Sequence, residues 1–106
     1  MFRGFVMTTT EAVQELQTVR GEIDEIDRAL VELIATRLDL AREARLLKDL
    51  GGLRYDDPAR EAAVVRRAAE AARELELEPE IVRDVFWRLI ALSKWAHSTE
   101  RVLEAG

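Results

Sequence analysis

A run of about 40 residues with uninterrupted helical periodicity constrains this chain more than any other feature. Between residues 10 and 49 no proline or glycine pair occurs, and apolar or small residues recur three or four positions apart. The stripe comprises Val13, Leu16, Val19, Ile23, Ile26, Leu30, Leu33, Ile34, Ala41, Ala44 and Leu47. Thr8 and Glu11 have capping-box spacing before it, and Gly51-Gly52 suits a helix stop after it. The sequence therefore predicts one helix from about residue 10 to about residue 49.

A helix of that length is too long for a chain of this size to cover by itself. At 1.5 Å per residue it spans about 60 Å, whereas a compact chain of 106 residues has a diameter of about 30–35 Å. The apolar stripe continues along the whole helix, and in water it would form a large exposed patch. We therefore expect an intertwined homodimer in which the two long helices pack antiparallel on each other.

Two shorter helices are predicted downstream of the glycine pair. Asp57 suits an N-cap and Pro58 the first helical turn, so the second helix should begin there. The third should begin at Pro79, with residues 50–56 and 76–78 as connections. The inner faces are assigned to Glu61, Val64, Val65, Ala68, Ala72 and Leu75 in the second helix, and to Ile81, Val82, Val85, Phe86, Leu89, Ile90 and Ala96 in the third.

These elements predict an all-α fold, a three-helix chain with a very long first helix. We expect residues 10–100 to form one helical domain, residues 1–9 a disordered or frayed N-terminus, and residues 101–106 a C-terminal tail. The opening MFRGFVM lacks the apolar core of a signal peptide, and no stretch approaches the roughly 20 apolar residues of a membrane span. A cytoplasmic location is therefore expected, with Met7 as an alternative initiator to Met1.

Charge and residue types exclude several functional classes. The net charge of −5 argues against a nucleic acid or an anionic membrane as the main partner, because both need a basic surface. Without cysteine, and with a single histidine, the sequence offers no thiolate nucleophile, no disulfide and no multi-histidine metal site. Any anion-binding site must therefore be local.

Two cations interrupt the inner stripe of the long predicted helix. Arg37 and Lys48 are eleven residues apart, about three turns, so they share a face about 16 Å apart along the axis. Ala41 and Ala44 between them leave a hollow in which two long side chains can hold a compact dianion. Alternatively, both cations extend to solvent over the rim of the helix, which is commoner for any single Arg or Lys.

Arg20 belongs to the same helix but to a different side of it. It precedes Arg37 by 17 residues, which places it about 25 Å away along the axis. It can therefore serve the same small ligand only from the partner subunit of the expected dimer.

The inner faces of the other two helices also carry polar residues. In the third helix, one stripe becomes polar toward its end, where Ser93 and His97 follow Ile90. Each has an ordinary explanation, since Ser93 can bond back to a helix carbonyl and a lone His often lies at a core edge. Together they indicate a polar neighbour, or a stripe that has drifted to the surface.

The start of the second helix combines three polar side chains with free backbone N–H groups. Such a helix end binds anions or hydroxyls, which makes Asp57, Arg60 and Glu61 candidate ligand-binding residues. An ordinary helix start explains the same residues, with Asp57 as the cap, Glu61 at the positive helix end and Arg60 solvated. The local sequence leaves both interpretations open.

At these positions the chain resembles the all-α chorismate mutase family, in its short monofunctional form. The resemblance covers roughly residues 16 to 100 and is carried by "VRGEIDEIDRALVELIATRLDLA" with Lys48 following, "DDPAREAAVVRRA" and "EIVRDVFWRLIALS". The residues in register are Arg20, Arg37, Lys48, Asp57, Arg60, Glu61 and Ser93. The resemblance implies intertwined dimers of three-helix chains, whose long first helix crosses both subunits.

The resemblance also implies how cations would bind chorismate. Arg37 and the partner subunit's Arg20 would bind the two carboxylates, with Arg60 adding positive charge. Lys48 would donate to the ether oxygen and help to hold a carboxylate.

The remaining positions concern the ring of the substrate. Glu61, with the backbone near Asp57, would receive the ring hydroxyl, and Ser93 would assist at the ring carboxylate. His97 stands where the family usually has Gln, which donates to the ether oxygen beside Lys48. Either neutral tautomer of His97 still offers one N–H, and the imidazolium would be a stronger donor. The residues expected to be catalytic are Lys48, His97, Arg37 and Glu61.

The reaction implied is the unimolecular [3,3] sigmatropic shift of chorismate to prephenate, an isomerisation of the shikimate pathway that needs no nucleophile, metal or cofactor. Aromatic amino acid and specialised biosynthesis both remain open, as does an activating partner enzyme. The same fold hosts isochorismate-pyruvate lyases and mutases of 4-amino-4-deoxychorismate. Glu61 favours a donor at ring position 4 and fits isochorismate less well, while the His97 departure keeps the amino analogue open. A catalytically silent helical dimer serving as a regulatory module is the non-enzymatic alternative.

Overall fold

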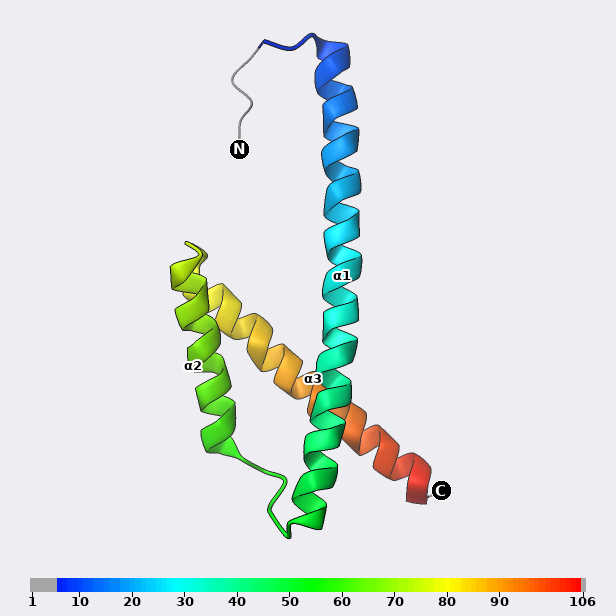
Figure 1. Ribbon diagram of the computed structural model, residues 1–106, viewed down its shortest axis with the longest axis vertical. Helices are drawn as coiled ribbons and strands as arrows, with labels where there is room; N and C mark the ends of the chain where they lie inside the picture. The colour runs from blue at the N-terminus through cyan, green and yellow to red at the C-terminus, as the bar shows by residue number, and fades with distance from the viewer. Residues whose placement is uncertain (1–5, 106) are drawn as a thin grey trace. The chain divides into compact units, whose positions relative to one another are not determined.

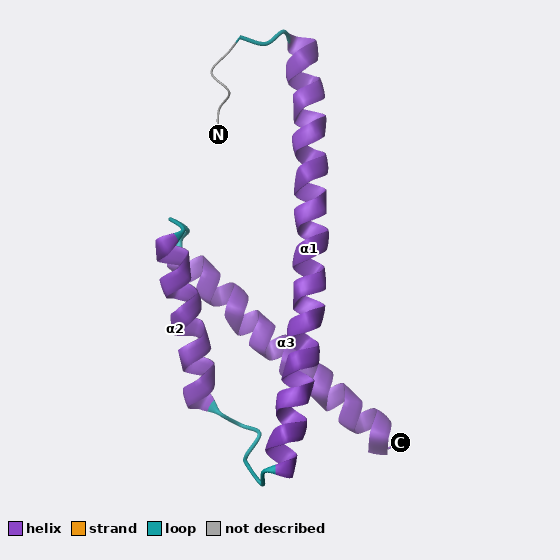
Figure 2. Ribbon diagram, viewed as in Figure 1, coloured by secondary structure: helices purple, strands orange, loops and turns teal. Residues whose placement is uncertain are grey.

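The computed structural model describes residues 6–105, and it consists of three helices joined by two short connections (Figure 1). The helices are α1 (Thr9–Leu50), α2 (Pro58–Glu74) and α3 (Pro79–Ala105). No strand occurs in the described part of the chain (Figure 2). The all-α class and the order of one very long and two shorter helices are thus confirmed. None of the three described helices contains an apolar stretch of the length that a bilayer span requires.

The ends of the helices agree with the local sequence signals. Thr8 Oγ1 accepts a hydrogen bond from the backbone N–H of Glu11 at 3.1 Å, as the capping-box spacing predicts. At the other end of α1, Gly52 has a φ of 68°, a left-handed conformation that favours glycine. The backbone N–H of Leu53 then donates to the carbonyl of Lys48 at 2.8 Å, which ends α1 and keeps Lys48 in its last turn. Helix α3 continues to Ala105, while residues 1–5 and 106 of the expected terminal segments lie outside the described residues.

The chain divides between Ala35 and Thr36 into two compact units. The described part of the first unit is essentially the N-terminal portion of α1, and its apolar stripe faces solvent. Exposed fractions of 37% to 65% are found for Val13, Leu16, Val19, Ile23, Ile26, Leu30 and Leu33. No residue of α1 is buried along its whole length. A single chain therefore leaves this stripe uncovered.

The second unit has its core between α2 and α3. The buried residues are Val65, Ala68, Ala69 and Ala72 of α2 and Ile90 and Ala96 of α3. Three of the four α2 positions are alanines, so the two helices can approach closely. Two residues assigned to the inner side of the third helix, Ile81 and Val85, are instead 63% and 49% exposed. They lie four residues apart on one side of α3, and α2 leaves that side exposed.

Candidate functional site

All the predicted site residues except Arg20 lie in the second unit of the chain. They come from the end of α1, the start of α2 and the second half of α3. Arg20 lies in the first unit, where its side chain is exposed. The other predicted site residues therefore lie within one compact unit.

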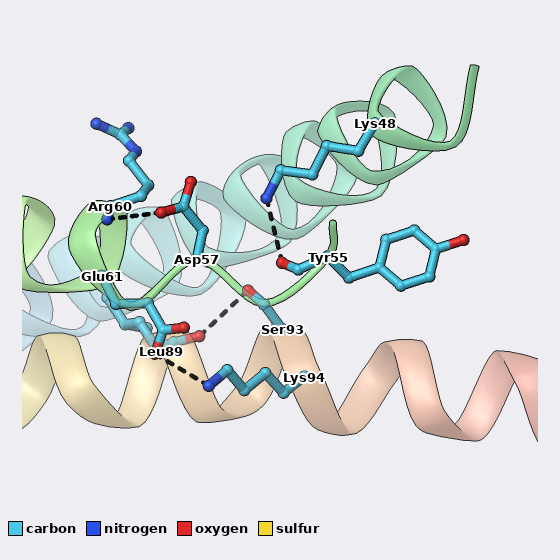
Figure 3. Close-up of polar contacts among 8 residues, drawn as sticks. All are labelled: Lys48, Tyr55, Asp57, Arg60, Glu61, Leu89, Ser93 and Lys94. Atoms are coloured by element: carbon cyan, nitrogen blue, oxygen red, sulfur yellow. Dashed lines mark hydrogen bonds and ion pairs between the residues drawn. The ribbon is translucent and has the colours of Figure 1, made fainter. Parts of the chain in front are cut away.

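Arg37 of α1 and Ser93 of α3 are brought into contact. Arg37 Nη1 donates to Ser93 Oγ at 3.4 Å, and both residues are half-buried. Ser93 Oγ in turn donates to the carbonyl oxygen of Leu89 at 3.2 Å (Figure 3). The bond back to the helix, foreseen as the ordinary explanation of Ser93, is therefore present together with the contact to a site cation. With its proton directed at Leu89, the hydroxyl turns its lone pairs to the guanidinium.

Lys48 is half-buried and directed at the connection between α1 and α2. Its Nζ donates to the backbone carbonyl of Tyr55 at 3.3 Å (Figure 3). An ammonium group carries three N–H donors, so it can also serve an incoming acceptor. The contact orders the long side chain and keeps its charge at the side of the unit where the α1–α2 connection runs.

Tyr55 is a member of this cluster that the sequence analysis missed. The guanidinium carbon of Arg45 lies 3.4 Å from the centre of the Tyr55 ring, a cation–π contact. The second ring partner is His97, whose ring centre lies 6.0 Å from that of Tyr55 at an interplanar angle of 45°. Tyr55 thus connects Arg45 and Lys48 of α1 with His97 of α3. The available signal was the single aromatic residue of the connection, two positions before a helix cap.

The start of α2 separates the three polar residues predicted there. Asp57 is the N-cap, and its carboxylate accepts from the backbone N–H of Arg60 at 3.0 Å. Arg60 is exposed, and its guanidinium points away from the other labelled side chains (Figure 3). Glu61 is directed toward α3 instead, where its Oε1 accepts from Lys94 Nζ at 3.0 Å. Glu61 therefore contacts α3, the helix that carries Ser93, whereas the Arg60 side chain lies apart from the other predicted site residues.

Chemically, Arg37, Lys48, Glu61 and His97 offer two cations, one carboxylate and one imidazole from three different helices. Arg37 and Lys48 can bind carboxylates or a developing negative charge, Glu61 can accept from a hydroxyl, and His97 can donate an N–H. Within the described residues, no three His, Cys, Asp or Glu side chains are grouped so as to hold a metal ion. A shallow depression lined by Asp84, Trp87, Arg88 and Ala91 lies elsewhere on α3 and contains none of the predicted residues. Arg37, Lys48, Glu61 and His97 together are suited to bind a small anionic molecule and to stabilise negative charge that develops on it.

Comparison with known proteins covers the same part of the chain. Residues 19–97 match the family model for chorismate mutase type II, a span that contains every predicted site residue. A chorismate mutase of Methanocaldococcus jannaschii is 32% identical over 82 residues, covering 77% of this chain and 83% of the relative. The T-protein of Enterobacter agglomerans is 36% identical over 78 residues, covering 74% of this chain. The chain spans only 21% of that T-protein. No solved structure gives a significant match.

Proposed function

Since the chain belongs to the type II chorismate mutase family of isomerases, we propose that it rearranges chorismate to prephenate in the cytoplasm. The observation that carries this proposal is the pair of half-buried cations, Arg37 and Lys48, on one side of α1 within the matched span. Each is already oriented by a polar contact, to Ser93 and to the Tyr55 carbonyl respectively. Such preorganised cations are what a flexible dianionic substrate needs.

The reaction requires conformational restraint and stabilisation of charge. The enzyme must hold the flexible dianion in its compact reactive shape and stabilise negative charge on the ether oxygen as the carbon–oxygen bond breaks. We assign the first task to Arg37 and the partner subunit's Arg20, which bind the two carboxylates, with Arg60 adding positive charge. We assign the second task to Lys48 and His97, which donate to the ether oxygen.

The ring of the substrate is held by the other two helices. Glu61, with the backbone near Asp57, receives the ring hydroxyl, and Ser93 assists at the ring carboxylate. The contact between Arg37 and Ser93 supports this assignment, because both would face the same carboxylate end.

A second copy of the chain completes each site in this proposal. Support comes from the apolar stripe of α1, which a single chain leaves exposed and which two antiparallel copies would cover. Arg20 lies on this helix, so a partner packed along it brings a further cation to the site. The homodimer is therefore part of the proposed mechanism.

Product analysis tests the proposed activity and distinguishes it from the related reactions on isochorismate and 4-amino-4-deoxychorismate. The protein is incubated with chorismate, isochorismate and 4-amino-4-deoxychorismate in turn, and the products are identified by mass. We expect prephenate from chorismate as the main reaction. Salicylate with pyruvate, or the amino counterpart of prephenate as the dominant product, would transfer the proposal to the alternative substrate. A silent regulatory dimer would give none of them, and a dianionic transition-state mimic would not raise its Tm.

Replacing Ser93 tests whether its contact with Arg37 matters for binding. In Ser93→Ala we expect KM to rise about 3–10-fold with kcat little changed, because the long contact that orients Arg37 is worth about one ordinary net hydrogen bond, roughly 0.5–1.5 kcal/mol. Ser98→Ala is the matched control, since Ser98 makes the same back-bond, to the carbonyl of Lys94 at 3.1 Å, but is exposed. Steady-state kinetics on both variants measure the difference. Equal KM values for Ser93→Ala and Ser98→Ala would remove Ser93 from the site.

His97 predicts a pH dependence that the usual Gln would not produce. An imidazolium donates more strongly to the developing anion than a neutral ring does, so activity should be higher below neutral pH and fall as the pH rises. The relevant range is about pH 5.5 to 8, in which histidine side chains commonly titrate. We expect His97→Gln to remain active and to lose this dependence. A flat kcat profile for the unmodified chain across that range would exclude a catalytic proton on His97.

A further inference from the structure

An ion pair between α2 and α3 involves a residue that has no part in the mechanism above. Lys94 Nζ donates to Glu61 Oε1 at 3.0 Å (Figure 3). The Glu61 side chain is 19% exposed, whereas that of Lys94 is 60% exposed. Glu61 is also the carboxylate proposed to receive the group at ring position 4 of the substrate. The charge of Lys94 therefore influences which substrate group Glu61 can bind.

We propose that Lys94 is a positioning residue that sets substrate specificity, making Glu61 accept a hydroxyl and reject an ammonium group at ring position 4. The inference rests on the proposed function and deepens it, because it chooses between chorismate and its 4-amino analogue. The His97 departure from the family pattern had left that choice open.

The geometry leaves Glu61 able to bind a hydroxyl while paired. A carboxylate has two oxygens with about four acceptor directions, and Lys94 occupies Oε1. Oε2 can still accept from the substrate. Since Glu61 and Lys94 lie on two packed helices, the ion pair also fixes the orientation of the carboxylate, which a single flexible side chain would not do.

Electrostatics then distinguish the two substrates. A hydroxyl carries no charge, so it meets a carboxylate whose charge Lys94 already balances. A primary amine in that place is largely protonated near neutral pH. An unpaired carboxylate would attract this ammonium, whereas Lys94, bound to the same carboxylate, repels it. At distances of a few ångströms, the repulsion between Lys94 and the substrate ammonium amounts to about tenfold discrimination in kcat/KM, after allowance for the solvent screening of an exposed Lys.

The test compares kcat/KM for chorismate and for 4-amino-4-deoxychorismate in the full-length protein and its variants. In Lys94→Gln we expect the ratio of the two values to move about tenfold toward the amino analogue. Lys94→Arg keeps the charge and should keep the ratio of the unmodified chain. Arg66→Gln removes a cation from another α2 ion pair, with Glu70 at 4.0 Å, and controls for the general loss of positive charge.

The variants should remain folded, because an ion pair with an exposed partner contributes little to stability. Lys94→Met, which retains most of the apolar stem, replaces Lys94→Gln if that variant does not fold. The inference alone fails if Lys94→Gln or Lys94→Met still converts chorismate but has a ratio of the two kcat/KM values within twofold of that of Arg66→Gln. Failure of the unmodified chain to convert chorismate would overturn the proposed function itself, and this inference with it.

Discussion

Lys48→Ala is expected to lower kcat for chorismate by about 10²–10³-fold, the usual loss when one preorganised donor to a developing negative charge is removed. The ether oxygen gains charge only as the bond breaks, so the loss should fall on kcat more than on KM. Arg37→Ala is expected to lose most activity as well, through poorer binding and orientation of a carboxylate. Initial-rate kinetics with each purified variant measure both effects.

The fold should survive these changes, which allows the kinetic loss to be interpreted. Lys48 makes a hydrogen bond to the Tyr55 carbonyl, a neutral acceptor near the surface, and its net contribution to stability is about 1 kcal/mol. Circular dichroism and size-exclusion chromatography should therefore match the unmodified protein. Arg28→Ala is the control for removing a cation from α1, since Arg28 is 79% exposed and pairs with Glu32. Wild-type turnover in Lys48→Ala or Arg37→Ala would refute the role of that residue.

Mixing two inactive variants is expected to restore activity. Each site is proposed to combine Arg37 of one subunit with the partner subunit's Arg20, so Arg20→Ala and Arg37→Ala each remove one half of every site. In a heterodimer of the two variants, one site contains both substitutions and the other contains neither. After dissociation and re-association of equal amounts, about a quarter of the wild-type activity should return.

The measurement compares the mixture with each variant carried alone through the same treatment. An exchange of subunits is verified with a tag on one variant, so that heterodimers can be isolated and counted. Verified heterodimers that remain as inactive as the two parents would show that Arg20 and Arg37 do not act together across the subunit interface.

Local signals explain why the starts of the three helices and the end of α1 were predictable from sequence, whereas the continuation of α3 to Ala105 was not. Thr8, Gly52 and Asp57 act on backbone groups a few residues away, so their effect depends little on the rest of the fold. The predicted start of the first helix lies one residue from the observed Thr9, and the second begins at Pro58 as expected. The contact of Ser93 with the Leu89 carbonyl is of the same local kind.

Contacts between helices were harder to predict from the sequence, because they depend on how far one helix covers another. The exposure of Ile81 and Val85 follows from the limited face that α2 covers, which periodicity along α3 alone does not reveal. Tyr55 lies in a connection without periodicity, and its two ring partners are on different helices. Lys94 is separated from Glu61 by 33 positions, so nothing in the sequence of either helix pairs them.

Because α1 buries none of its own residues, the stability of the proposed dimer should depend on protein concentration. If its apolar stripe is satisfied only by another copy, folding and association become one equilibrium, governed by mass action. The fraction of functional molecules is then set by how much of the chain is present, and dilution alone can inactivate it. Abundance becomes a determinant of catalysis, in addition to the chemistry of the site.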